Sequence, residues 1–268
     1  MKQKTEIEGR NIAYTLLGPE DAPAVVLGHA LGSNSNIWGY QLPLLMTRCR
    51  VLVYDLPGHG ESDPPIKQDS FDDLANDLAE LLDYTGISRA TFVGLSIGGM
   101  IAQHFALLHP DRLQALVLCS TGCQTDEAGK KIFGDRIGQV SEGGVESQVE
   151  GSMSRWFTPQ FVSDAPATIE WVKGMYRKTS PAGFINACRA IQELDTLNRL
   201  SSITAPTLLI PGELDPAFPV SVSRTMQSRI KNAELKVLAG VAHIGNVERP
   251  HEFNEILFKF LAELAPQN

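Results

Sequence analysis

Short apolar runs recur along the chain and are separated by segments with a different periodicity. The runs are mostly continuous rather than alternating, and they fall at residues 24–28, 51–55, 91–95, 115–119, 207–211 and 235–238. Continuous apolar runs are typical of strands buried on both faces of a parallel sheet. Two further segments, residues 6–8 and 12–16, flank Gly9 and Arg10 and predict an N-terminal hairpin.

Helical spacing occupies the segments between the apolar runs. Ser70 and Asp73 provide an N-cap and an acidic residue three positions later, ahead of a stop at Gly86. The apolar stripe between them consists of Leu74, Leu78, Leu81 and Leu82. Near the C-terminus Pro250 can open a helix, whose stripe consists of Phe253, Ile256, Leu257, Phe260, Leu261 and Leu264. Strand and helix therefore alternate, which predicts a doubly wound α/β fold with a mostly parallel sheet.

One long segment interrupts this alternation. Between roughly residues 122 and 200 the chain has several glycines and helix-like stretches but no strong strand candidate. A segment inserted between two strands of an open α/β sheet lies above the carboxyl edge of the sheet, where such folds bind ligands. We therefore predict a core of residues 1–121 and 201–268, and a helical lid of residues 122–200.

Composition narrows the possible partners. The chain has 268 residues, of which 43% are hydrophobic, and this suffices for a sizeable core. Its formal net charge of -8 provides no basic field for nucleic acid or anionic lipid. Its longest apolar runs are far shorter than the roughly 20 residues of a membrane span. We expect neither a nucleic-acid nor a membrane partner, and no secretory signal follows the charged N-terminus, so we expect a cytoplasmic protein.

The cysteines and histidines predict no metal site. The cysteines are too scattered for a disulfide framework or a paired zinc site, and they stand at Cys49, Cys119, Cys123 and Cys188. His104 and His109 lie five residues apart on a predicted helix, with no carboxylate or cysteine at ligand spacing. The chain also lacks the phosphate-loop ending and the G-x-G-x-x-G spacing of nucleotide sites, so neither nucleotide-binding motif is present.

The sharpest local motif is a G-x-S-x-G at residues 94–98. It directly follows the apolar run at residues 91–95 and precedes a helical run at residues 100–108. In that context the motif predicts a nucleophile elbow, in which a strained turn presents Ser96 above the edge of the sheet. A glycine-rich turn holding an ordinary N-cap serine is the competing interpretation.

A serine nucleophile needs a base and a group that orients the base. His243 lies in the loop between the last predicted strand and the last helix, at the same sheet edge as the elbow. Asp215 follows the preceding strand, with Glu213 as the competitor for the acidic role. The order Ser96, Asp215, His243 is the order expected for a triad on this kind of sheet.

Acyl transfer also requires hydrogen-bond donors for the oxyanion. The backbone N–H of Ile97, directly after the nucleophile, is one candidate. The second should come from the loop after residue 28, where we expect the N–H of Leu31 to take this role.

These features together resemble the α/β-hydrolase superfamily across essentially the whole chain. The resemblance rests on residues 94–99 (GLSIGG), residues 55–62 (DLPGHGES), Asp215 and His243. Three further fragments are similar to 3-oxoadipate enol-lactone hydrolases, namely residues 155–159 (RWFTP), 179–184 (TSPAGF) and 242–248 (AHIGNVE). The sequence departs from the superfamily at the oxyanion loop, where the common His-Gly pair is His29-Ala30.

The resemblance implies a cofactor-free hydrolase that cleaves a small carboxylic ester or lactone through an acyl-enzyme. Ser96 argues against the dehalogenases and many epoxide hydrolases of this scaffold, because those require an aspartate at the elbow. A carbon-carbon hydrolase, a cofactor-free perhydrolase and a small-ligand receptor with a retained triad stay open. An enol-lactone carries a carboxylate, so we expect an arginine of the lid to face the pocket. The pocket candidates are Arg155, Trp156, Arg177 and Arg189.

Overall fold

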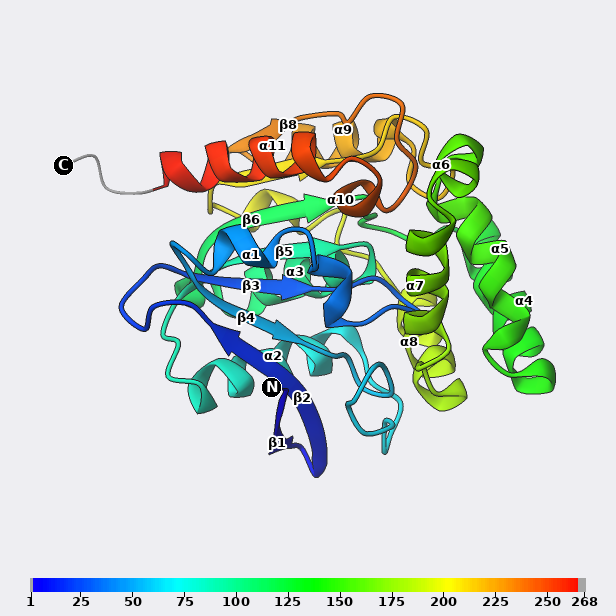
Figure 1. The fold of residues 1–268 in the computed structure, drawn as a ribbon. Helices are drawn as coiled ribbons and strands as arrows, with labels where there is room; N and C mark the ends of the chain where they lie inside the picture. Colours follow the sequence, from blue (N-terminus) through cyan, green and yellow to red (C-terminus); the bar gives the residue numbers. More distant parts are fainter. Residues whose placement is uncertain (1, 265–268) are drawn as a thin grey trace.

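The computed structural model describes residues 2–264, and their centre is an eight-stranded sheet (Figure 1). The ends of the predicted core, residue 1 and residues 265–268, lie outside the described residues. The strand order is β1-β2-β4-β3-β5-β6-β7-β8. The strands are β1 (Gln3–Ile7), β2 (Arg10–Leu17), β3 (Ala24–Gly28), β4 (Arg50–Tyr54), β5 (Ala90–Leu95), β6 (Leu113–Cys119), β7 (Thr207–Ile210) and β8 (Ala233–Leu235). The pairs β1–β2 and β2–β4 are antiparallel and the remaining pairs are parallel, which confirms the predicted sheet.

The apolar runs became strands because they are buried on both faces. Every residue of β5 is buried, as are nearly all residues of β6. The last strand was predicted at residues 235–238, but the edge strand β8 begins two residues earlier, at Ala233, and ends at Leu235. Beyond β8 the pairing continues irregularly, with Lys236 N–H donating to Leu209 O at 2.9 Å and Leu238 N–H to Pro211 O at 2.9 Å.

Helices cover both faces of the sheet. In Figure 1, α2 and α3 lie on one face, while α1 and α11 lie on the other. The helices of the core are α1 (Leu42–Leu45), α2 (Phe71–Tyr84), α3 (Ile97–Leu108), α9 (Val220–Arg229), α10 (Gly245–Glu248) and α11 (Pro250–Glu263). Short 3-10 helices occur at Ser35–Trp38, Pro110–Arg112 and Leu200–Ser202. The predicted cap of α2 is confirmed, because Ser70 Oγ accepts from Asp73 N–H at 3.1 Å and the Asp73 carboxylate accepts from Ser70 N–H at 2.8 Å.

Five helices follow β6 and stand beside the carboxyl ends of the strands (Figure 1). They are α4 (Glu127–Gly143), α5 (Glu146–Trp156), α6 (Pro159–Asp164), α7 (Pro166–Tyr176) and α8 (Pro181–Gln192). Side chains cap three of them, namely Asp126 on α4, Thr158 on α6 and Ser180 on α8. We call this helical segment the lid, and its boundaries at residues 122 and 200 stay a prediction.

A buried polar cluster attaches the lid to the core. Arg10, which is 2% exposed, donates to both oxygens of Asp69 and also contacts Asp77. Asn186 of α8 donates to Asp69 Oδ2 at 2.7 Å and accepts from Asp69 N–H at 2.9 Å. A second attachment is made by Ser180 N–H, which donates to Gly58 O at 2.7 Å. The lid is therefore held at a defined place above the sheet edge.

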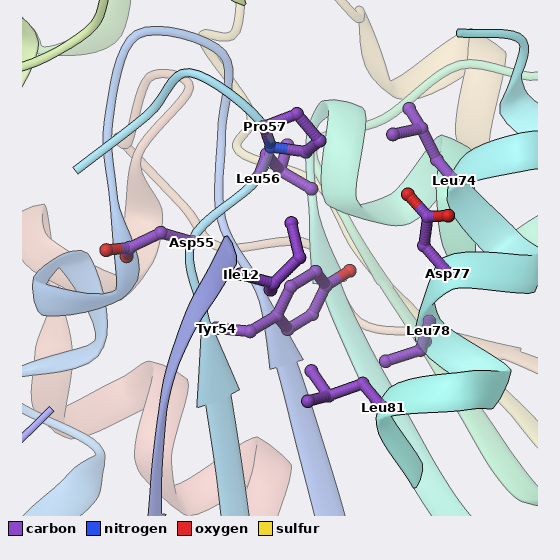
Figure 2. Close-up of a pocket in the computed structure, with 9 residues that line it drawn as sticks. All are labelled: Ile12, Tyr54, Asp55, Leu56, Pro57, Leu74, Asp77, Leu78 and Leu81. Atoms are coloured by element: carbon purple, nitrogen blue, oxygen red, sulfur yellow. The ribbon is translucent and has the colours of Figure 1, made fainter. Parts of the chain in front are cut away.

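Figure 2 shows a small cavity between β4 and α2, lined mostly by apolar side chains. Its volume is about 10 Å³, and the Tyr54 ring lies between Ile12 and Leu81. Such a volume is of the order of one water molecule. This cavity belongs to the core packing, and an organic substrate needs a larger space elsewhere.

Candidate active site

Ser96 stands on a strained turn between β5 and α3. Its backbone has φ +55° and ψ −117°, a left-handed conformation that few non-glycine residues adopt. Such strain costs about 1–3 kcal/mol and persists only where the surroundings enforce it. Here Ser96 N–H donates to Cys119 O at 2.9 Å, and Thr121 Oγ1 donates to Ser96 O at 2.7 Å. The predicted elbow geometry is therefore present, and it places a serine that is 8% exposed at the carboxyl edge of the sheet.

The glycines of the elbow are required by close backbone approach. A Cβ atom on Gly94 would lie 2.4 Å from Gly98 O, and one on Gly98 would lie 2.4 Å from Gly28 O. No side chain fits at either distance, because real Cβ contacts essentially never fall below about 3 Å. The G-x-S-x-G spacing thus lets strand β5 and helix α3 meet tightly enough to form the turn.

His243 and Asp215 are in direct contact. Nδ1 of His243 lies 2.8 Å from Oδ2 of Asp215, and both side chains are buried. Asp215 Oδ1 accepts from the backbone N–H groups of Ala217 at 2.8 Å and Phe218 at 3.1 Å. Burial alone would raise the pKa of Asp215, but the neighbouring His243 and these hydrogen bonds bring it below its ordinary value. The carboxylate is therefore ionised, and Nδ1 of His243 donates to it, which leaves Nε2 as the unprotonated nitrogen of the neutral ring.

Glu213, the competitor for the acidic role, binds a backbone N–H group instead of His243. Its side chain is exposed, and Oε2 accepts from Gly240 N–H at 2.8 Å. Among the two acids that follow β7, Asp215 is the one that reaches His243.

The two oxyanion candidates have free backbone donors. Leu31 N–H and Ile97 N–H donate to no acceptor in the part of the chain that the structure describes. Buried backbone N–H groups are nearly always paired, so two free ones at a serine elbow are available to a ligand oxygen. Leu31 lines the same cavity as Ser96, and Ile97 begins α3 immediately after it.

Buried hydrogen bonds around His29 hold the loop that carries Leu31. His29 Nδ1 lies 2.8 Å from Ala30 O, and Nε2 accepts from Leu56 N–H at 2.9 Å. Burial is the main cause that lowers the pKa of His29, so the ring is neutral and Nδ1 is the donor. Ala30 O also accepts from Ser33 N–H at 3.0 Å. The departure from the common His-Gly pair is accommodated because Ala30 has no positive φ, whereas Gly32 has φ +75°.

Residues 55–62 (DLPGHGES) form hydrogen bonds with this loop. Asp55, which is fully buried, accepts from Ser35 N–H at 2.8 Å through Oδ1 and from Glu61 N–H at 2.9 Å through Oδ2. Ser62 Oγ donates to Asp55 O at 2.6 Å. This block shapes the site from outside the cavity, since Asp55 is not among its lining residues.

A cavity of about 700 Å³ lies between the elbow and the lid. Leu31, Ser96 and His243 contribute to its floor, and Arg155 and Trp156 of α5 contribute to its lid side. The cavity has the size expected for a small-molecule site. The structure thus brings the predicted nucleophile and the predicted base into one cavity together with two of the predicted lid residues.

The other two lid arginines do not line this cavity. Arg177 forms a bidentate ion pair with Glu146, with Nε at 2.9 Å from Oε2 and Nη2 at 2.9 Å from Oε1. Arg189 is exposed on α8. Of the pocket candidates, Arg177 and Arg189 therefore do not face the cavity, because both side chains lie at the surface of the lid, whereas Arg155 lines it.

Arg136 of α4 lines the cavity and was missed by the sequence analysis. Arg136 and Arg155 form no ion pair with an acidic group of the described residues. The wall's own acids have other partners, since Asp126 caps Gly129 N–H at 2.8 Å and Asp135 pairs with Lys131 at 2.8 Å. Burial, and secondly the charge of Arg136, lower the pKa of Arg155 to about 10.

A sequence signal for Arg136 existed. It shares a helical face with Ile132 and Phe133, at spacings of four and three residues, so it interrupts an apolar stripe. An arginine on such a stripe faces the same side of the helix as its apolar neighbours, which here is the cavity.

Residues 2–264 contain no group of three or more His, Cys, Asp or Glu side chains that could hold a metal ion. His104 Nδ1 lies 2.6 Å from Asp72 Oδ1, a partner 32 residues away in the sequence. Within the described part of the chain, no helix has the length and apolar character needed to cross a membrane.

Comparison with known proteins agrees with this geometry. The profile of a family described as alpha/beta hydrolase fold matches residues 23–250. The chain belongs to the α/β-hydrolase family. It is 33% identical to 3-oxoadipate enol-lactonase 2 of Acinetobacter baylyi over 241 residues, which cover 90% of this chain and 89% of that protein. It is 30% identical to a putative carbamate hydrolase, RutD, of Pantoea ananatis over 258 residues, covering 94% of each chain.

A solved structure is similar over almost the full length. The enol-lactonase from Burkholderia xenovorans LB400 superposes with a TM-score of 0.93 at 28% identity, covering 97% of this chain and 100% of that one. These likenesses confirm the predicted α/β-hydrolase fold and the predicted similarity to enol-lactone hydrolases, and they support a hydrolase as the enzyme class.

Proposed function

We propose that this α/β-hydrolase is a serine hydrolase that cleaves a small carboxylic ester or lactone through an acyl-enzyme. The observation that carries the proposal is that Ser96, on its strained turn, lines the same cavity as His243, whose Nδ1 is bound to Asp215. This arrangement supplies a nucleophile, a base and a group that orients the base. No metal or cofactor takes part in the proposed reaction.

In the acylation step Ser96 Oγ attacks the carbonyl carbon and His243 Nε2 takes the serine proton. The carbonyl oxygen becomes an oxyanion, which the N–H groups of Leu31 and Ile97 stabilise. When the tetrahedral intermediate collapses, the bond to the leaving oxygen breaks and His243 returns the proton to that oxygen. Asp215 stays ionised throughout and stabilises the imidazolium.

In the deacylation step a water molecule attacks the acyl carbon and His243 takes one of its protons. The bond to Ser96 Oγ then breaks, the serine regains a proton from His243, and a carboxylic acid is released. A lactone substrate gives a single ring-opened product, because its acyl and alkoxy parts belong to one molecule.

Turnover decides whether the chain is an enzyme or a receptor with a retained triad. We expect the purified protein to release product from a small neutral aryl ester over many cycles per protein molecule. Release that stops near one equivalent would overturn the proposal. A screen of lactones, esters and carbamates of graded size and charge then ranks the substrate classes, the carbamates being included because of the named relative.

Within this class we propose 3-oxoadipate enol-lactone, or a lactone similar to it, as the substrate. Its support is the likeness to two proteins named enol-lactonases, together with the two cavity arginines that have no acidic partner among the described residues. A guanidinium can bind a carboxylate with two parallel hydrogen bonds, which offsets the desolvation of the anion. Arg155 is the lid residue that we assign to this contact, and Arg136 is its neighbour in the same cavity.

We expect Arg155→Ala to raise KM for the enol-lactone by about tenfold or more, since a hydrogen bond to a charged group is removed. KM for the same lactone carrying a primary amide in place of its carboxylate should change little. Arg136→Ala should act in the same direction. Steady-state kinetics on both lactones measure these effects.

Arg177→Ala is the matched control, because Arg177 belongs to the same lid but pairs with Glu146 at the surface. It should leave both KM values near those of the wild type. If the Arg155 and Arg136 variants treat the charged and neutral lactones alike, the anionic substrate is excluded, while the assignment as a serine ester hydrolase survives.

A further inference from the structure

Glu248 is a buried carboxylate at the end of α10, outside the cavity described above. It is 6% exposed. Oε1 accepts from Thr158 N–H at 3.1 Å and from the Thr158 hydroxyl, and Oε2 accepts from Ala242 N–H at 3.1 Å. In the described part of the chain it forms no ion pair. Burying a carboxylate is costly unless it is hydrogen-bonded, so these three donors account for its stability in this place.

The donors come from two segments that meet at the site. Thr158 belongs to the lid, where it caps α6 two residues after Trp156 of the cavity wall. Ala242 directly precedes His243. On the other side of His243, Ile244 N–H donates to Trp156 O at 3.0 Å. Both neighbours of His243 are thus hydrogen-bonded toward the lid, one through Glu248 and one directly.

We propose that Glu248 is a positioning residue that holds the lid and the His243 loop together as one unit, so that His243 is aligned with Ser96. Both carboxylate oxygens act as acceptors, one toward the lid and one toward the loop. An amide in this place would direct an N–H group at one of these donors, and one of the two attachments would be lost. The effect on catalysis rests on the proposed function, in which His243 is the base.

Glu248→Gln tests the proposal with a side chain of the same shape. We expect kcat on a small neutral aryl ester to fall by about tenfold to a hundredfold, because misplacing a catalytic group costs of this order. KM should change much less, since the cavity walls are retained. In proton NMR, the Nδ1–H resonance of His243, shifted downfield by its hydrogen bond with Asp215, should broaden or move.

Glu252→Gln is the matched control, because Glu252 is an exposed glutamate in the first turn of α11. It should keep the wild-type kcat and the wild-type imidazole resonance. A merely structural Glu248 would lower the melting temperature of its variant without moving kcat of the folded enzyme or the resonance of His243.

Thr158 supplies a second test from the lid side. Thr158→Val removes the hydroxyl donor and should lower kcat in the same direction, whereas Thr158→Ser keeps the hydroxyl and should restore it. In the double variant with Glu248→Gln the loss should be smaller than the product of the two single losses, because both changes break one shared contact.

Three outcomes overturn the proposal. In a folded Glu248→Gln enzyme, kcat within about twofold of the wild type would exclude it. If Glu248→Gln fails to fold, Thr158→Val takes its place, and a kcat of that variant within about twofold of the wild type would exclude the proposal. If the wild type turns over no ester at all, it is the proposed function that fails, and an unchanged His243 resonance in the Glu248→Gln protein would then independently exclude the positioning role.

Discussion

Ser96→Ala should reduce hydrolysis of a neutral aryl ester by at least about three orders of magnitude, as loss of a serine nucleophile does. The change removes only Oγ, because the hydrogen bonds that hold the turn use the Ser96 backbone N–H and carbonyl. The fold should therefore persist, with a melting temperature close to that of the wild type. Initial rates with purified protein, together with thermal unfolding, measure both effects.

Covalent labelling checks the same residue without relying on turnover. A fluorophosphonate should add its phosphonyl group to Ser96 Oγ with loss of fluoride, and mass spectrometry should find one adduct on the wild type and none on Ser96→Ala. Ser154→Ala is the control, since Ser154 is exposed on α5 and donates only to Gly151 O at 3.1 Å. A Ser96→Ala protein that keeps more than about a tenth of the wild-type rate would exclude the proposed mechanism.

The central strands could be predicted from the sequence because their environment leaves a strong local signal. A strand buried on both faces, such as β5 or β6, needs an unbroken apolar run, and that run is visible without any tertiary information. The edge strand β8 lacks that signal, because it pairs on one side only and Val237 beyond it is 37% exposed. Its position depends on the neighbouring β7, which a local pattern does not report.

The residues at the sheet edge were equally predictable, for a related reason. Ser96, Asp215 and His243 each follow a strand of a parallel sheet, and parallel strands bring their carboxyl ends to the same edge. The sequence favoured Asp215 over Glu213 by its place after the strand, and the structure adds the contact of Asp215 with His243 while the exposed Glu213 binds Gly240 N–H. The contact that distinguishes the two acids joins Asp215 and His243, which are 28 residues apart in the sequence.

The orientation of the lid arginines was the feature least predictable from the local sequence. Whether an arginine on a lid helix faces the cavity depends on how that helix packs on its neighbours, and not on nearby sequence. Arg177 has an aromatic neighbour, Tyr176, that does line the cavity, yet Arg177 itself is turned outward to Glu146. Arg136 lies on the same face of α4 as Phe133, and both line the cavity.

The remaining test concerns the base and its dependence on pH. If neutral His243 takes the Ser96 proton, kcat/KM should fall as the pH drops, because a protonated imidazole has no free Nε2 to accept it. The pKa of Asp215 is held below its ordinary value despite burial, so this carboxylate stays ionised over the acid limb. Burial is the main cause that lowers the pKa of His59 to about 3, which keeps that ring neutral.

The acid limb therefore reports His243 rather than the buried histidines beneath the oxyanion loop. His243→Ala should remove the limb together with nearly all activity. Asp215→Asn should reduce kcat by about 10⁴, as loss of the orienting carboxylate does in related triads, while leaving a measurable residue. His109→Ala serves as the control, because His109 is on the far end of α3 and contacts Asn76 at 2.9 Å. A flat profile from mildly acidic to neutral pH, under conditions in which chemistry limits the rate, would exclude His243 as the base.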